Sequence, residues 1–243
     1  MTDERETLVA GVDGCRAGWV VVAAPAEGPV AGAAGTAVAV LEVTVIADLA
    51  SVFADLKPGR IAAAAIDIPV GLPPHGPRAC DTEARRLLGA RRSSVFPAPV
   101  RSVLGATSYE EACARSEVAC GKKISRQLFN ILPKIQQVDE LVTPQRQAHV
   151  FEMCPELSFA FLAGAPMRAY KMTAAGRAER ASALEAVFGD VEELVRKPPP
   201  GAASDDVLDA LIGVWTARRY VARAHVRLGG ELDATGLRME MIA

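Results

Sequence analysis

The stretch Thr7-Leu-Val-Ala-Gly-Val-Asp13 is a run of residues suited to a buried strand, and it ends in a carboxylate. An apolar run without alternation predicts a strand that is covered on both faces. The next residues, Gly14-Cys-Arg-Ala-Gly18, include two glycines that accept turn conformations, and residues 19–24 are apolar again. We therefore expect a hairpin that places Asp13 beside its turn.

Strand and helix patterns follow this hairpin in mixed order, which predicts an α/β fold. The segment 75–147 carries helical signals and little strand signal, so we expect a mostly helical insertion there that forms a lid. Ser204 is expected to cap the last long helix. The expected strands are at about 38–45, 61–67 and 149–153, and the expected helices at about 48–56, 81–88, 108–120, 125–141, 156–162, 177–188 and 204–227.

Composition limits the function classes. The chain has 243 residues, of which half are apolar, and a formal net charge of -2. Binding to nucleic acid must therefore depend on a local basic surface. Five cysteines and three histidines without metal-ligand spacing argue against a zinc site or a disulfide framework. The chain has no apolar run of about 20 residues and starts with acidic residues, so we expect a cytoplasmic protein that does not contact membranes.

Carboxylates recur at the ends of apolar runs. Asp67 ends the run 61–67, Glu152 ends Val-Phe-Glu, and Asp206 and Asp209 stand three residues apart on the last helix. A buried carboxylate is costly unless a partner compensates its charge, and divalent metal ions do this for clusters of carboxylates. We therefore expect a centre of two Mg²⁺ or Mn²⁺ ions, about 4 Å apart, that acts on phosphodiesters. The expected metal ligands are Asp13, Asp67, Glu152, Asp206 and Asp209.

Simpler interpretations compete with this one. Asp13 precedes a glycine and suits a turn, Glu152 suits an ion pair with an arginine, and Asp206 suits the first turn of a helix. Asp209 lies a full turn inside its helix, where neither a cap nor the helix dipole explains it.

Basic residues in and near the insertion are candidates for contact with substrate phosphates. Arg91-Arg-Ser-Ser94 combines two guanidinium groups with two hydroxyls, and Arg78 and Lys171 are further candidates. The alternative is an ordinary solvated helix surface.

Several ordered motifs resemble the DUF429 family, a family of predicted nucleases with an RNase H-like fold. They are Gly-Val-Asp13-Gly-Cys-Arg-Ala-Gly-Trp19, Ile-Asp67-Ile-Pro-Val-Gly-Leu72, Arg78-Ala-Cys-Asp81, Glu152-Met-Cys-Pro-Glu156 and Asp205-Asp-Val-Leu-Asp209-Ala. The resemblance implies a single domain with a central mixed sheet. It also implies that metal ligands come from the first strand, the fourth strand and the last helix.

The leading hypothesis is a metal-dependent nuclease that acts on DNA or RNA. Asp13, Asp67, Glu152 and Asp209 are its expected catalytic residues, and Arg78, Arg91, Arg92 and Lys171 are expected to bind substrate. Two alternatives remain open at this point. One is a nucleotide-binding phosphotransferase related to actin-like ATPases and sugar kinases, and the other is an inactive nucleic-acid-binding or scaffold module. Sequence alone leaves the oligomeric state undetermined.

Overall fold

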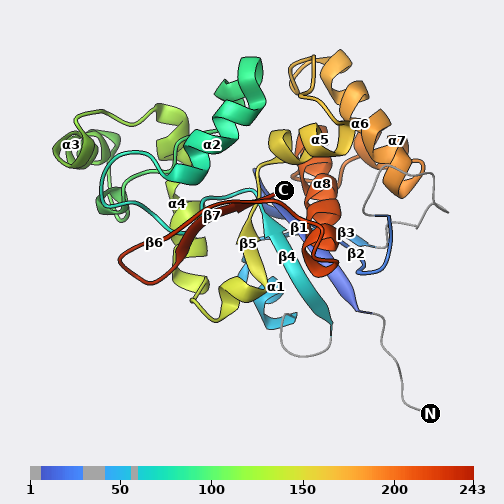
Figure 1. Cartoon of the computed structure of the whole chain (residues 1–243), viewed down its shortest axis with the longest axis horizontal. Helices are drawn as coiled ribbons and strands as arrows, with labels where there is room; N and C mark the ends of the chain where they lie inside the picture. The colour runs from blue at the N-terminus through green and yellow to red at the C-terminus, as the bar shows by residue number, and fades with distance from the viewer. Residues whose placement is uncertain (1–6, 30–41, 56–59) are drawn as a thin grey trace, which may run out of the picture.

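The computed structural model describes residues 7–29, 42–55 and 60–243, and its centre is a five-stranded sheet in the order β3-β2-β1-β4-β5 (Figure 1). β2 runs antiparallel to both β1 and β3, whereas β4 runs parallel to β1 and β5 parallel to β4. This mixed sheet with flanking helices confirms the α/β class expected from the sequence. The strands are β1 (Leu8–Cys15), β2 (Gly18–Pro25), β3 (Glu42–Ile46), β4 (Ile61–Ile66) and β5 (Val150–Glu152).

The expected hairpin is formed by β1 and β2, which are joined through Arg16 and Ala17. Gly18 begins β2 with φ of +136°, and a Cβ at this position would lie 2.1 Å from the carbonyl oxygen of Ile46. Only glycine fits so close to β3 in this conformation. The hairpin therefore depends on the second glycine of its turn.

One face of the sheet is covered by α8 (Ser204–Val221), which is buried continuously from Val207 to Arg218. The helix approaches β1 closely because glycines meet at the contact. A Cβ on Gly11 would lie 1.9 Å from the carbonyl oxygen of Ala210, and one on Gly213 would lie 2.9 Å from the Cα of Gly11. Three further helices surround α8 on this side (Figure 1), namely α5 (Pro155–Ala163), α6 (Ala174–Phe188) and α7 (Glu192–Arg196).

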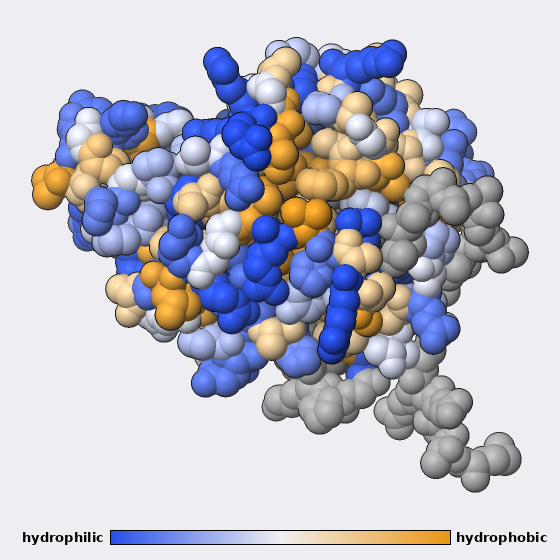
Figure 2. All heavy atoms as spheres, viewed as in Figure 1, coloured by the Kyte–Doolittle hydropathy of each residue, from blue (hydrophilic) through white to orange (hydrophobic). Residues whose placement is uncertain are grey.

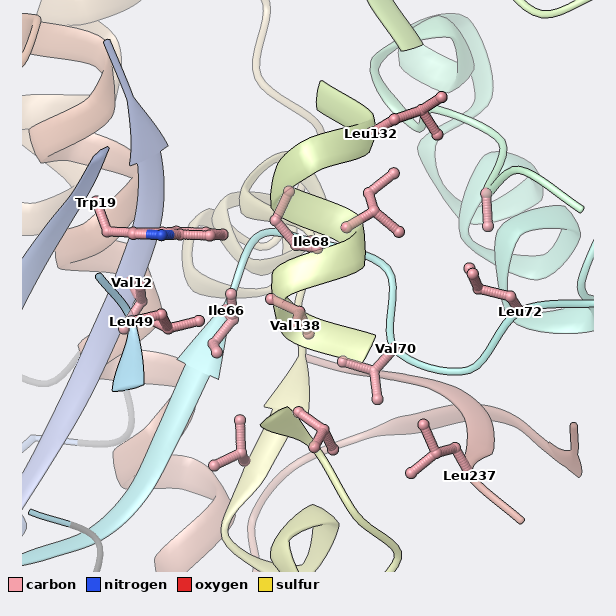
Figure 3. Packing of buried hydrophobic residues seen from close by; sticks show 14 of the residues in the cluster. Val12, Trp19, Leu49, Ile66, Ile68, Val70, Leu72, Leu132, Val138 and Leu237 are labelled. Carbon is pink, nitrogen blue, oxygen red and sulfur yellow. The ribbon is translucent and has the colours of Figure 1, made fainter. Parts of the chain in front are cut away.

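The opposite face packs against α4 (Arg126–Leu141) and α1 (Ala50–Asp55). Figure 3 shows α4 between the strands, which contribute Val12 and Ile66, and the segment that carries Val70 and Leu72. Leu132 and Val138 of α4 belong to the same buried cluster. Within the insertion expected at 75–147, α4 thus forms a layer of the core, because an apolar stripe of this helix covers the sheet.

A third group of elements lies beside the main sheet. It comprises α2 (Ala79–Leu88), α3 (Tyr109–Cys120) and a two-stranded sheet of β6 (Arg227–Leu232) and β7 (Arg238–Ile242). Apolar residues on the face shown in Figure 2 gather over α5 and between α5 and α2, with hydrophilic residues on both sides. No helix in the described ranges has the length and apolar character needed to cross a membrane.

Helix starts show where the sequence rules worked and where they failed. Ser108 and Ser125, the first residues of two expected helical segments, cap α3 and α4. Ser204, the expected cap of α8, instead donates its hydroxyl to the carbonyl of Val195. Asp206 reaches back to the amide of Ala203 at 2.8 Å and does the capping. The pattern did not predict α7 or the β6–β7 hairpin, and residues 38–41 of the expected third strand lie outside the described residues.

The contact between β1 and α8 can be tested with Gly11→Ala. The added methyl group would overlap the backbone of α8 at Ala210, which cannot move without shifting the helix. We expect the free energy of unfolding, measured by chemical denaturation, to fall by about 3 kcal/mol. Gly14→Ala on the same strand is the control, because its Cβ would meet only the flexible side chain of Lys134. Equal losses in both variants would contradict the role of this contact.

Candidate functional site

Asp13 and Asp67 lie side by side at the carboxyl ends of two parallel strands. Val12 and Ile66 are register partners in β1 and β4, and the amide of Asp67 donates to the carbonyl of Val12 at 3.0 Å. Side chains alternate between the faces of a strand. Asp13 therefore shares a face with Gly11, and Asp67 continues the face of Ala65, which is the face that α8 covers.

Asp209 joins these two carboxylates from α8. It precedes Ala210, whose carbonyl packs against Gly11, and only 1% of Asp209 is exposed. Asp13 is also buried. Three carboxylates from two strands and one helix thus meet at one edge of the sheet, where β1, β4 and α8 come together (Figure 1).

The pKa values of these three carboxylates reflect how close together they lie. Burial, followed by the charges of Asp67 and Asp209, raises the pKa of Asp13 well above its ordinary value. Burial and the charge of Asp209 raise the pKa of Asp67 to about 7. The pKa of Asp209 is also raised, chiefly by burial. Like charges held in a poorly solvated site disfavour ionisation. A positive charge next to the cluster would therefore favour the ionised carboxylates.

Lys171 supplies part of that positive charge. Its Nζ lies 2.6 Å from Oδ2 of Asp209, and its charge lowers the pKa of Asp13, Asp67 and Asp209. The other oxygen of Asp209, Oδ1, is buried and has no hydrogen-bond partner within the described residues. Nor does any described residue form an ion pair with Asp13 or Asp67.

Asp206 lies one turn before Asp209, and its environment is different. It is partly buried, and its Oδ2 accepts the amide hydrogen of Ala203. Burial raises its pKa, and the charge of Asp206 in turn raises the pKa of Asp13. Asp206 is therefore close to Asp13, but one of its oxygens is already occupied by the helix cap.

Glu152 points to the other side of the sheet. It is the register partner of Ile66, which packs toward α4, while Asp67 one residue later faces α8. Burial raises the pKa of Glu152 to about 7 although the charge of Arg78 opposes this. The two side chains form a bidentate pair at 2.5 and 2.6 Å, and Glu152 also accepts from the amide of Val70 at 2.8 Å. Of the alternatives for Glu152, the structure shows the ion pair with an arginine.

Arg78 is itself fully engaged, although its position in the sequence suggested a contact with substrate. Besides Glu152 it binds Asp81 at 2.6 Å and donates to the carbonyls of Val70 and Gly71. Asp81 in turn accepts from the amide of Ala98 at 3.1 Å. This buried network ties the segment after β4 to the first turn of α2, and it leaves little of the guanidinium group for a ligand.

Arg91 and Arg92 lie in a short 3-10 helix, η1 (Gly89–Ser94). Arg91 is buried, donates to the carbonyl of Ala169 and stacks over Tyr170 at 4.1 Å. Arg92 is exposed. Two neighbouring residues of one motif therefore have opposite surroundings, and Arg92 is the one that faces solvent.

Sequence reasoning missed Lys134 of α4, a second cation near the cluster. Its Nζ donates to the carbonyl of Gly18 and lies 4.5 Å from the ring centre of Trp19. Burial lowers the pKa of Lys134, and the charge of Asp13 opposes this shift. A lysine in an amphipathic helix carries no signal for such a position, because α4 meets β2 only in the folded chain.

A cavity of about 90 Å³ opens next to Asp67. Phe96, which is 43% exposed, stands at this cavity, and its lining is otherwise mostly apolar. The lining includes Ile68, Val95, Leu128, Ile131, Met153 and Met241, together with Glu152 and Cys154. The carboxylate cluster thus has an apolar hollow beside it with an accessible aromatic ring.

The residues present fit a hard divalent cation in their chemistry. Carboxylate oxygens are the ligands that Mg²⁺ prefers, and the buried, unpartnered Oδ1 of Asp209 is such an oxygen. The described part of the chain holds no group of three His, Cys, Asp or Glu side chains that is arranged as it stands to bind a metal ion. Lys171 occupies one oxygen of Asp209 in this arrangement.

The fold and the site define an α/β protein with an acidic centre where the carboxyl ends of β1 and β4 lie. The family described as "Protein of unknown function (DUF429)" matches residues 11–231, and the chain belongs to this family. The matched range contains Asp13, Asp67, Asp209 and Lys171. Comparison with curated proteins and comparison with solved structures each found no match.

The raised pKa of Asp67 predicts a pH dependence of stability in metal-free solution. The folded chain keeps a proton that the unfolded chain releases near pH 4, so the free energy of unfolding falls as the pH rises from about 4 to about 7. Asp67→Asn removes this contribution. We expect the variant to be more stable than the parent by about 1 to 2 kcal/mol at about pH 8, as measured by urea denaturation.

The control for Asp67→Asn is Glu117→Gln, which changes an exposed carboxylate of α3. Its stability should follow that of the parent at every pH. A parent whose stability stays level between about pH 4 and 7, or an Asp67→Asn variant that is destabilised at about pH 8, would contradict the buried cluster.

Proposed function

We propose that the protein is a divalent-metal-dependent phosphodiester hydrolase of RNase H-like fold that acts on nucleic acid. Asp13, Asp67 and Asp209 are the proposed metal ligands and Asp206 a neighbouring acid. The observation that carries the proposal is that three carboxylates lie close together, two of them buried, and that neither Asp13 nor Asp67 forms an ion pair within the described residues. Membership of the DUF429 family and the mixed sheet agree with the fold that the resemblance implies.

The chemistry of the site follows from its charges. A bound Mg²⁺ or Mn²⁺ ion would activate a water molecule and stabilise the oxygen that leaves the phosphorus atom. Asp13 and Asp67 are set on rigid strand ends, so their oxygens are already positioned. Burial of Asp13 and Asp209 limits solvation, which strengthens their attraction for a cation.

Contacts with the rest of the substrate are proposed for groups around the cluster that face solvent. Arg92 is exposed on η1 and is suited to contact a phosphate. Phe96 offers an aromatic face beside Asp67, and unpaired bases stack on such faces without a sequence preference. We therefore favour a substrate with an unpaired segment near the bond that is cleaved.

Asp13→Asn tests the proposed activity. The variant keeps the shape of the side chain but loses the charge that holds the cation, so Mn²⁺-dependent cleavage of DNA or RNA should fall by about a hundredfold or more. Because burial already disfavours the charged form, the metal-free variant should unfold no earlier than the parent. Cleavage is measured on labelled oligonucleotides, with EDTA added as a blank and Glu117→Gln as the matched variant. Unchanged cleavage by purified Asp13→Asn would rule out this assignment.

Phe96→Ala tests the proposed contact with a base. Loss of one stacking contact costs about 1 to 3 kcal/mol, so affinity for a single-stranded oligonucleotide should fall by about tenfold. Binding is measured by fluorescence anisotropy with Ca²⁺ in place of Mg²⁺. Phe161→Ala on α5 removes a phenyl ring of similar exposure and should bind like the parent. If both variants bind alike, the cavity beside Asp67 has no such role.

A further inference from the structure

Lys171 lies beside the carboxylates that are proposed to hold the metal. It forms an ion pair with Asp209 at 2.6 Å, and it lowers the pKa of Asp67 and Asp13 as well. In return, the charge of Asp209, ahead of those of Asp67 and Asp13, raises the pKa of Lys171. The ammonium group therefore forms an ion pair with Asp209 and lies close enough to Asp13 and Asp67 for their charges to affect one another.

The segment that carries Lys171 is fixed by contacts on both of its sides. Just before the lysine, the carbonyl of Ala169 accepts from Arg91 at 3.3 Å and from Arg180 at 3.2 Å, and its amide donates to Glu179 at 2.9 Å. Just after it, Thr173 caps α6. The backbone on either side of Lys171 is thus held in place, in part by the buried side chains of Arg91 and Arg180.

The ion pair between Lys171 and Asp209 limits the room for cations at the cluster. The ammonium group lies 2.6 Å from Oδ2 of Asp209, so it occupies one of the oxygens that a metal ion would use and places a positive charge there. A second divalent cation in the same small site would lie close to the ammonium group, which repels it. Asp209 keeps one buried oxygen, Oδ1, without a partner, and this oxygen is free to meet a single ion while Oδ2 stays with Lys171.

We propose that Lys171 takes the place of a second metal ion, so that the centre binds one Mg²⁺ or Mn²⁺ ion per chain. This inference rests on the proposed function, and it replaces the pair of ions expected from the sequence. Lys171 acts as a positioning residue, because its ammonium group holds Asp209 and sets the charge that the carboxylates present to the ion. Removing that charge frees Oδ2 of Asp209 for a metal ion.

The test is the titration of the full chain with Mn²⁺ by isothermal calorimetry, compared with Lys171→Met, Lys171→Arg and Lys123→Met. The parent should bind one ion. Lys171→Met should bind Mn²⁺ about tenfold more tightly or accept a second ion, because a competing positive charge has been removed. Lys171→Arg keeps the charge and should bind one ion like the parent. Lys123→Met changes an exposed lysine outside the cluster and should not alter binding.

Electron paramagnetic resonance of the Mn²⁺-loaded parent gives a second readout. Two neighbouring Mn²⁺ ions would show spin coupling, whereas a single bound ion shows none. Two ions in the parent, or unchanged or weaker binding by Lys171→Met, would overturn the role of Lys171. No binding of Mn²⁺ by the parent would contradict the proposed function itself, so the two failures are distinguishable. Should Lys171→Met fail to fold, as judged by circular dichroism, the number of ions in the parent still decides the proposal.

Discussion

The close contact between α8 and β1 is the constraint on which the site depends. Gly11 and Gly213 let the backbones of the helix and the strand approach so closely that a methyl group would overlap Ala210. This approach brings Asp209 beside Asp13, and the parallel pairing of β1 with β4 adds Asp67. A slightly wider spacing would separate carboxylates whose interaction falls with distance. Helix packing therefore controls the electrostatics of the centre.

The buried acids of this chain fall into two groups with different partners. Glu152 pairs with Arg78 and Glu156 with Arg180, so the low dielectric strengthens these pairs and each holds two segments together. Asp13 and Asp67 have no such partner within the described residues. Keeping carboxylates in poorly solvated positions without an ion-pair partner destabilises the fold, and this cost indicates a site that serves a ligand. The contrast within one chain separates structural acids from candidate functional ones.

Local patterns predicted much of the fold. The hairpin of β1 and β2, the apolar strand β4 and the helices α2 to α6 were expected close to their observed bounds, because periodicity and capping act over a few residues. Ser204 was misjudged as a cap because its hydroxyl has a partner in α7, which the pattern did not predict. The acids Asp13, Asp67 and Asp209 were identified by their positions after apolar runs and inside a helix. That these three side chains lie close together could not be predicted in the same way, because it depends on the register of the sheet.

The sequence by itself determined the α/β class, the family, and which residues carry charge at strand ends. Only the tertiary structure decided which of those charged side chains pair with one another. Glu152 ends a strand just as Asp67 follows one, yet a shift of one residue along the pleat turns it to the opposite face and to Arg78. Lys171 and Asp209 are 38 residues apart in the chain, with α6 and α7 between them, and they pair only in the folded structure. Such pairings depend on distances in space, which no local pattern of residues encodes.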